Sequence, residues 1–187
     1  MDYVYPDFQK VIAILRKSNV EIKNPKPARN FQTRLIIQKI IFLCKFLGIN
    51  MKRYNFSLYK NGPYSPDLTA DYYNNNEIIA ALETSYQLNQ KEQEIVEKIN
   101  KIVLDHTLSK YNQADLLEAV STAYYIKHYD EDILDDDLFK KIKEEKPFIS
   151  AKIIITAINL VKKLRFKQEY LTKEIQDELD LWDKAED

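Results

Sequence analysis

The side chains that most often bind metals or act as nucleophiles are few in this chain of 187 residues. Its two histidines stand near aspartates, His106 directly after Asp105 and His128 shortly before Asp130. A metal-dependent phosphohydrolase built on such a pair needs further histidine and aspartate ligands, which the composition does not supply. The one cysteine, Cys44, lies among apolar residues of an expected helix, where burial raises the pKa of a thiol and makes it inert. We therefore expect no metal, no cofactor and no enzymatic activity.

Sequence motifs for binding nucleotides or calcium are also absent from the sequence. With two glycines, Gly48 and Gly62, neither a P-loop nor a dinucleotide-binding glycine pattern can be written. Residues 130–137 hold six acids in eight positions, but they lack the spacing of a calcium-binding loop. We interpret this acidic run as a solvated loop.

A more specific pattern is the turn Asn61-Gly62-Pro63-Tyr64-Ser65, which Pro66 follows. Gly62 permits a positive φ, and Ser65 can cap a helix whose first residue is Pro66. These structural needs explain most of the motif without a ligand. The alternative is that Tyr64 is an exposed aromatic anchor for a protein partner, with Asn61, Gly62 and Ser65 shaping the turn around it.

The charges are distributed unevenly along the chain. Residues 22–66 carry nine basic residues and no acid, whereas residues 67–187 carry 16 basic and 26 acidic residues. A basic surface attracts phosphate backbones or acidic partners, and aromatic residues are interleaved with the basic ones, as in single-strand binding surfaces. The candidate nucleic-acid contacts within residues 23–60 are Lys26, Arg29, Arg34, Lys52, Arg53 and Lys60. The alternative is that the aromatic residues are core and the basic ones a solvated face.

Periodicity predicts a mainly α protein with a small β element. Apolar spacing and caps predict helices over 7–17, 31–47, 66–74, 90–104, 112–128, 136–146, 150–166 and 171–184, and alternation predicts a strand over 55–60. Residues 77–88 are compatible with two short strands, although 77–82 could equally continue a helix. We expect one domain over 1–187, with an N-terminal lobe to residue 88 and a helical lobe from residue 89 that ends in an acidic helix.

The order of elements in the first lobe is that of a winged helix. In such a fold the helix over 66–74 would occupy the recognition position, and residues 77–88 would form the wing. That helix contains Asp67 and Asp71 and no base, so phosphates would repel it from a DNA groove. The sequence therefore predicts a winged-helix-like lobe that does not read DNA with this helix.

Three segments carry a resemblance to a known family. They are Arg34-Leu35-Ile36-Ile37-Gln38-Lys39-Ile40-Ile41-Phe42-Leu43, then Tyr54-Asn55-Phe56, and then Tyr59-Lys60-Asn61-Gly62-Pro63-Tyr64-Ser65-Pro66-Asp67-Leu68. Together they resemble the YwgA family, which is similar in turn to the SocA-like antitoxin domain, also called the Panacea domain. Weaker matches follow in residues 116–125 and in Lys146-Pro147-Phe148.

The resemblance implies an intracellular protein without catalysis that binds another protein, either a toxin or a degradation machine. Our first hypothesis is therefore a non-enzymatic, antitoxin-like or adaptor module, and the alternative is a nucleic-acid-binding regulator that uses residues 23–60. No apolar run is long enough for a membrane span and no export signal is evident, so we expect a cytoplasmic protein without a membrane partner. Leu181 and Trp182 in the polar C-terminal segment could contact a second protomer, which leaves a homodimer open.

Overall fold

The computed structural model describes residues 5–20 and 30–166. Within these ranges the protein is mainly helical with one small antiparallel sheet, which confirms the predicted fold class. The elements, in chain order, are α1 Pro6–Lys17, α2 Phe31–Phe46, β1 Ser57–Tyr59, β2 Gly62–Tyr64, α3 Pro66–Asn74, α4 Asn76–Ala81, α5 Gln90–Ile99, the π-helix Asn100–Leu104, α6 Ser109–Tyr129, α7 Asp135–Glu145 and α8 Ala151–Arg165. The helix predicted over 171–184 lies outside the described residues.

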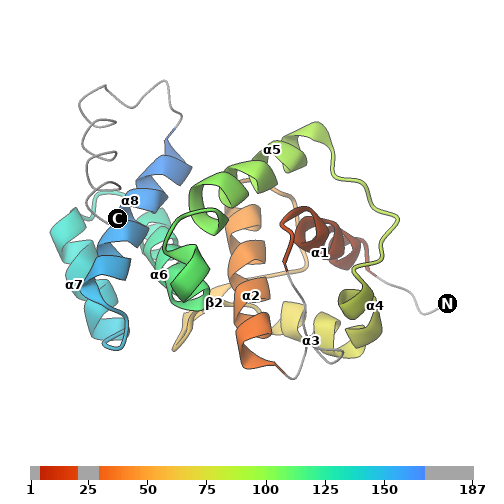
Figure 1. Cartoon of the computed structure of the whole chain (residues 1–187), viewed down its shortest axis with the longest axis horizontal. Helices are drawn as coiled ribbons and strands as arrows, with labels where there is room; N and C mark the ends of the chain where they lie inside the picture. The colour runs from red at the N-terminus through yellow and green to blue at the C-terminus, as the bar shows by residue number, and fades with distance from the viewer. Residues whose placement is uncertain (1–4, 21–29, 167–187) are drawn as a thin grey trace.

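Helix α2 runs through the middle of the molecule, between α1 on one side and α6 on the other (Figure 1). Its sequence is apolar around most of its circumference, and almost every side chain from Ile37 to Cys44 is buried. A helix of this composition is stable only inside a fold, because it has no wide polar face to present to water. Helix α6 packs in turn against α7 and α8.

One continuous cluster of buried apolar side chains includes residues from every described helix. It extends from Phe8 in α1 through Phe42 in α2 and Val120 in α6 to Leu164 in α8. The two lobes predicted to meet near residue 88 therefore share this core. In the described residues no helix is long and apolar enough to cross a bilayer.

A short hairpin precedes α3. Strands β1 and β2 pair antiparallel, with Ser57 opposite Tyr64 and Tyr59 opposite Gly62. Gly62 has φ +80°, in the left-handed region that favours glycine. Ser65 caps α3 by accepting a hydrogen bond from the Leu68 amide, and α3 spans the residues predicted for it. The sequence had predicted β1 as a strand and β2 only as a turn, because a three-residue strand that contains Pro63 has no alternation to detect.

The predicted wing is wrong. Residues 76–81 form helix α4, and the segment from residue 82 to 89 contains no strand. The hairpin of the described residues lies before α3, whereas a wing follows the recognition helix. Residues 76–81 form a helix and not a strand because the side chain of Ile79 is then fully buried in the core. Leu82, with φ +52°, then ends the helix.

Candidate functional site

A pocket of about 350 Å³ lies where α2, the hairpin and α3 meet. This volume is at the small end of the range that binds small molecules or single anchoring side chains. Three of its lining residues are cationic and none is acidic. The wall consists of Phe31, Arg34, Leu35, Gln38, Lys39, Tyr59, Lys60, Asn61, Gly62, Tyr64, Thr69 and Tyr72. We call this the hairpin pocket.

The mouth of the hairpin pocket is aromatic. On the hairpin, the rings of Tyr59 and Tyr64 meet edge to face with their centroids 5.3 Å apart. On the helices, the Arg34 guanidinium lies 5.8 Å from the ring of Phe31 and 6.0 Å from that of Tyr73, whose hydroxyl accepts a hydrogen bond from it. Phe31 and Tyr59 are each more than half exposed, so this mouth presents apolar and cationic groups to solvent.

The wall between α2 and α3 is held by a buried glutamine. The Gln38 side chain accepts a hydrogen bond from the Ser65 amide at 2.9 Å and donates one to the Ser65 carbonyl at 3.0 Å. Its amide also donates to the Thr69 hydroxyl at 3.0 Å. These contacts hold the end of the hairpin and the first turn of α3 against α2 next to Tyr64.

Behind the hairpin lies a buried cluster of two lysines and one glutamate. Lys39 of α2 donates to the Pro63 carbonyl at 2.8 Å. Lys146, which follows α7, lies 3.0 Å from a carboxylate oxygen of Glu118 in α6 and also donates to the Lys60 carbonyl. All three charged side chains are less than 5% exposed. Two ammonium groups thus hold hairpin carbonyls, and the cluster contains one more cation than anions when all three are ionised.

Lys39 titrates near neutrality because of this environment. Burial is the largest cause and lowers the pKa of its ammonium to about 7. The Glu118 carboxylate opposes the shift, whereas the neighbouring Lys146 cation adds to it. A lysine pKa near 7 beside a pocket is typical of functional sites, although structural ion networks produce it as well.

Gly62 is required at this position by both conformation and space. Its φ of +80° is strained for any residue with a Cβ. A Cβ built here would lie 2.9 Å from the Thr122 hydroxyl of α6 and 3.3 Å from the Lys39 ammonium. The hairpin backbone therefore packs directly onto the buried polar cluster.

The residues predicted to contact a partner are divided between surface and interior. Asn61, Gly62 and Tyr64 line the hairpin pocket, but Ser65 is fully buried. Ser65 shapes the turn as its capping role requires, and its polar groups bond to Gln38 and to the α3 backbone, so it supports the site from the interior. Tyr64 is half-buried, and the exposed aromatic side chain of the hairpin is Tyr59.

The predicted nucleic-acid residues do not all gather in one place. Arg34 and Lys60 line the hairpin pocket, whereas Lys52 is exposed outside its lining. Lys26 and Arg29 lie outside the described residues. The sixth, Arg53, belongs to an internal ion pair and is described next.

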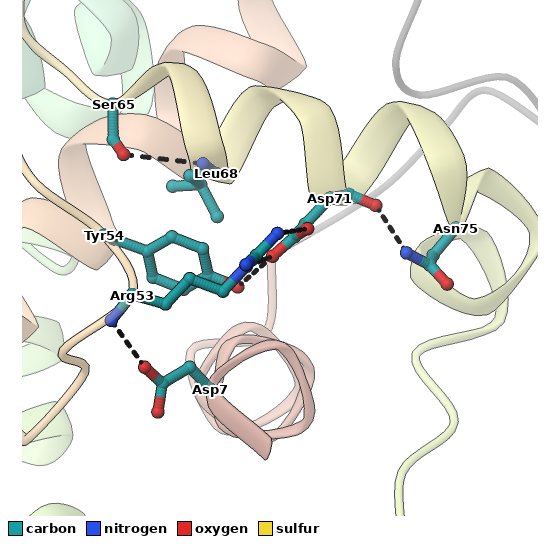
Figure 2. Close-up of polar contacts among 7 residues, drawn as sticks. All are labelled: Asp7, Arg53, Tyr54, Ser65, Leu68, Asp71 and Asn75. Carbon is teal, nitrogen blue, oxygen red and sulfur yellow. Dashed lines mark hydrogen bonds and ion pairs between the residues drawn. The ribbon is translucent and has the colours of Figure 1, made fainter. Parts of the chain in front are cut away.

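Arg53 is engaged in contacts within the protein, although its side chain remains 32% exposed, so its role in nucleic-acid binding stays a prediction. Its guanidinium donates two hydrogen bonds to the Asp71 carboxylate, at 2.7 and 2.8 Å (Figure 2). The guanidinium also stacks on the Tyr5 ring. Asp71 also accepts from the Tyr54 hydroxyl, and Asp7 accepts from the Arg53 amide. The Asp71 contact is the main cause that raises the pKa of Arg53.

This ion pair also reduces the number of unpaired acidic side chains on α3 that could repel phosphates. Asp71 is buried and neutralised by Arg53, so it does not face a ligand. Asp67 is the exposed acid of α3. The repulsion predicted between this helix and phosphates therefore rests on one carboxylate instead of two.

The remaining chemistry-bearing residues lie apart from the pocket. The His128 ring packs on Phe46 at the exposed end of α6, and His106 lies in the loop before that helix. Cys44 is fully buried, which raises the pKa of its thiol. In residues 5–20 and 30–166 no three His, Cys, Asp or Glu side chains are grouped so as to hold a metal ion. Of the acidic run, Asp135 to Asp137 form the first turn of α7 rather than a loop, where they favour the helix dipole.

Sequence reasoning did not find the buried cluster, although a signal for it was present. Gln38 and Lys39 interrupt an apolar helix that was expected to be buried on most sides, and Glu118 stands inside the apolar run of α6. Buried polar side chains must have partners, so these positions predict an internal network. Which groups complete it, here Lys146 and the hairpin carbonyls, depends on the fold.

Comparisons with protein-family models, with curated proteins and with solved structures each found no match for this chain.

Proposed function

We propose that this protein is a non-enzymatic binding module, antitoxin-like or adaptor-like, that holds a partner protein at the hairpin pocket. The observation that carries the proposal is the pocket itself, a concave site with aromatic walls next to an exposed hairpin. Protein interfaces are anchored by a few aromatic and arginine side chains in such settings. Tyr59, Tyr64 and Arg34 supply these side chain types here.

The family resemblance supports the same proposal. Its strongest segments supply Gln38 and Lys39 from α2 and the turn from Gly62 to Ser65, and these lie in contact with one another. The weaker segments supply Glu118 and Lys146, which lie behind the same hairpin. The residues that carry the resemblance therefore lie at or behind the same hairpin. SocA-like domains act by binding a protein, either a toxin or a degradation machine.

The test is partner capture from the native host by tagged wild-type protein and by two pocket variants, Tyr59→Ala and Tyr64→Ala. We expect each variant to weaken capture by about 1–3 kcal/mol, as for an interface anchor, while its melting temperature stays close to that of the wild type. The matched control is Tyr129→Ala, since Tyr129 is an exposed tyrosine on α6 outside the pocket lining. Equal capture by all four proteins would refute the proposal.

The same purification distinguishes the nucleic-acid alternative. A high 260/280 nm ratio in the eluate, together with affinity that falls steeply with salt, would indicate a nucleic-acid partner. Charge reversal at Arg34 and Lys60 would then abolish binding, whereas Tyr59→Ala would matter only through base stacking. The structure leaves this alternative fewer exposed cations than the sequence suggested, because Arg53 is paired with Asp71.

A further inference from the structure

Among the described residues, the cations of the hairpin pocket lack the carboxylate partners that several other cations have. In the described part of the chain, no acid lies within ion-pair distance of Arg34, Lys39 or Lys60, and none lines the pocket. Cations elsewhere on the described surface do have such partners, including Lys10 with Glu92, Arg53 with Asp71, Lys162 with Asp135 and Arg165 with Glu131. The pocket is thus a place of uncompensated positive charge in a protein of net charge −1.

We propose that the hairpin pocket recognises an acidic segment of the partner protein, inserting a carboxylate-bearing side chain between Arg34 and Lys60 with an apolar or aromatic neighbour against the tyrosines. This proposal rests on the proposed function and specifies the chemistry of the partner.

The groups at the pocket mouth match a carboxylate. A guanidinium presents a planar fork of donors that pairs with two carboxylate oxygens, and Arg34 is held in place by Phe31 and Tyr73 on either side. Lys60 lies at the hairpin turn and lines the same pocket. The rings of Tyr59 and Tyr64 line the wall and offer apolar area for a neighbouring side chain.

The buried cluster behind the wall also favours an anion. Lys39 and Lys146 share the single carboxylate of Glu118, so an anion in the pocket would compensate the second ammonium. Lys39 lines the pocket, but its ammonium donates to the Pro63 carbonyl, so its effect on the anion is electrostatic. Lys39 therefore acts as a positioning residue that also tunes the charge of the site.

The size of the pocket favours a peptide side chain over a nucleic-acid duplex. A cavity of about 350 Å³ holds one or two side chains, whereas a duplex contacts its protein over a long basic face. Phosphate sites commonly use backbone amides of a glycine-rich loop at a helix N-terminus. Here side-chain cations and aromatic rings form the wall instead.

The test uses two fluorescein-labelled peptides of eight residues. One contains Asp, Glu, Phe and Gly, and the other has each Asp and Glu replaced by Asn and Gln. We expect the acidic peptide to bind the full-length protein at least about tenfold more tightly, with affinity falling as salt rises. Arg34→Gln and Lys60→Gln should each weaken it about three- to tenfold. The matched control is Lys52→Gln, which changes an exposed lysine of the same basic segment outside the pocket and should leave the affinity unchanged.

A pH titration gives a readout that a purely structural role would not move. The groups that face Lys39 and the pocket are Glu118 from α6, Lys146 after α7, Arg34, Lys60 and the tyrosines Tyr59, Tyr64 and Tyr72. Between pH 6 and 8 the peptide carboxylates stay ionised while Lys39, with a pKa of about 7, loses its proton. Affinity should therefore fall as pH rises, and Lys39→Met should flatten this dependence.

Several results would overturn the proposal. They are equal binding of the acidic and amide peptides, no binding of either up to about 1 mM, and displacement by inorganic phosphate or a nucleotide at concentrations that a carboxylate does not match. The failure of this inference differs from that of the proposed function. If Tyr64→Ala still weakens capture of the native partner while the two peptides bind alike, the pocket binds a partner of different chemistry.

Discussion

Removing the carboxylate of Glu118 and removing the ammonium of Lys146 should have unequal effects on stability, although the two groups form one ion pair. Glu118→Gln leaves the buried Lys146 ammonium without a counter-charge, and Lys39, whose pKa of about 7 then falls further, becomes neutral. Leaving a buried charge unpaired costs about 3–5 kcal/mol. In a protein of this size that lowers the melting temperature by about 6–20 °C.

Lys146→Met leaves a different set of charges. Lys39 remains as a cation beside the Glu118 anion, so the cluster becomes neutral overall. The loss is then mainly the charge-assisted hydrogen bond from Lys146 to the Lys60 carbonyl, about 1–3 kcal/mol. We expect the free energy of unfolding to fall by about 2 kcal/mol more in Glu118→Gln than in Lys146→Met.

Urea unfolding at neutral pH measures both changes, and NMR titration of the Lys39 side-chain nitrogen measures the charge coupling. The pKa of Lys39 should rise in Lys146→Met, because a neighbouring cation is removed, and fall further in Glu118→Gln, because the stabilising anion is removed. Equal losses of stability, or a pKa of Lys39 that does not move in either variant, would show that the three side chains do not act as one cluster.

Three further predictions concern the same region and the core. Between pH 7 and 10 the free energy of unfolding should rise with pH by up to about 1.4 kcal/mol per unit, because the unfolded chain binds the Lys39 proton up to a pKa of 10.5 and the folded chain only to about 7; Lys39→Met should lose this slope in urea titrations. Gly62→Ala should destabilise the fold by about 1–3 kcal/mol, and adding Thr122→Ala should recover part of the loss in calorimetry, since it removes the contact at 2.9 Å. Cys44 should resist iodoacetamide in the native state and react only on unfolding, and fast native labelling seen by mass spectrometry would contradict its burial.

Local signals in the sequence were sufficient for most of the helices. The apolar spacing of α1, the Ser65-Pro66 start of α3 and the Pro147 stop after α7 predicted these elements to within a residue or two. Such signals depend on contacts within one turn of helix, on backbone angles and on capping groups, all of which are encoded by neighbouring residues. The turn at Gly62 could be predicted for the same reason.

Contacts between segments that are distant in the sequence decide which of the predicted residues lie together in the candidate site. The sequence assigned Asn61 and Tyr64 to a protein contact and Arg34 and Lys60 to a nucleic-acid contact, and the folded chain places all four around the hairpin pocket. It could not show that Arg53 is paired with Asp71, because both are polar residues whose partner lies in another element. Residue type and spacing alone do not distinguish these two paired side chains from unpaired charges at the surface.

The failed wing and the unforeseen lysine cluster have a common cause. Whether residues 77–82 form a strand or a helix depended on Ile79 reaching a core assembled from distant segments. Likewise, Lys39, Glu118 and Lys146 come from three elements, and their mutual charge effects exist only after α2, α6 and the end of α7 have packed. Local backbone preference and amphipathicity are therefore properties of the chain, whereas burial, which sets pKa and pairing, arises only when remote segments exclude water together.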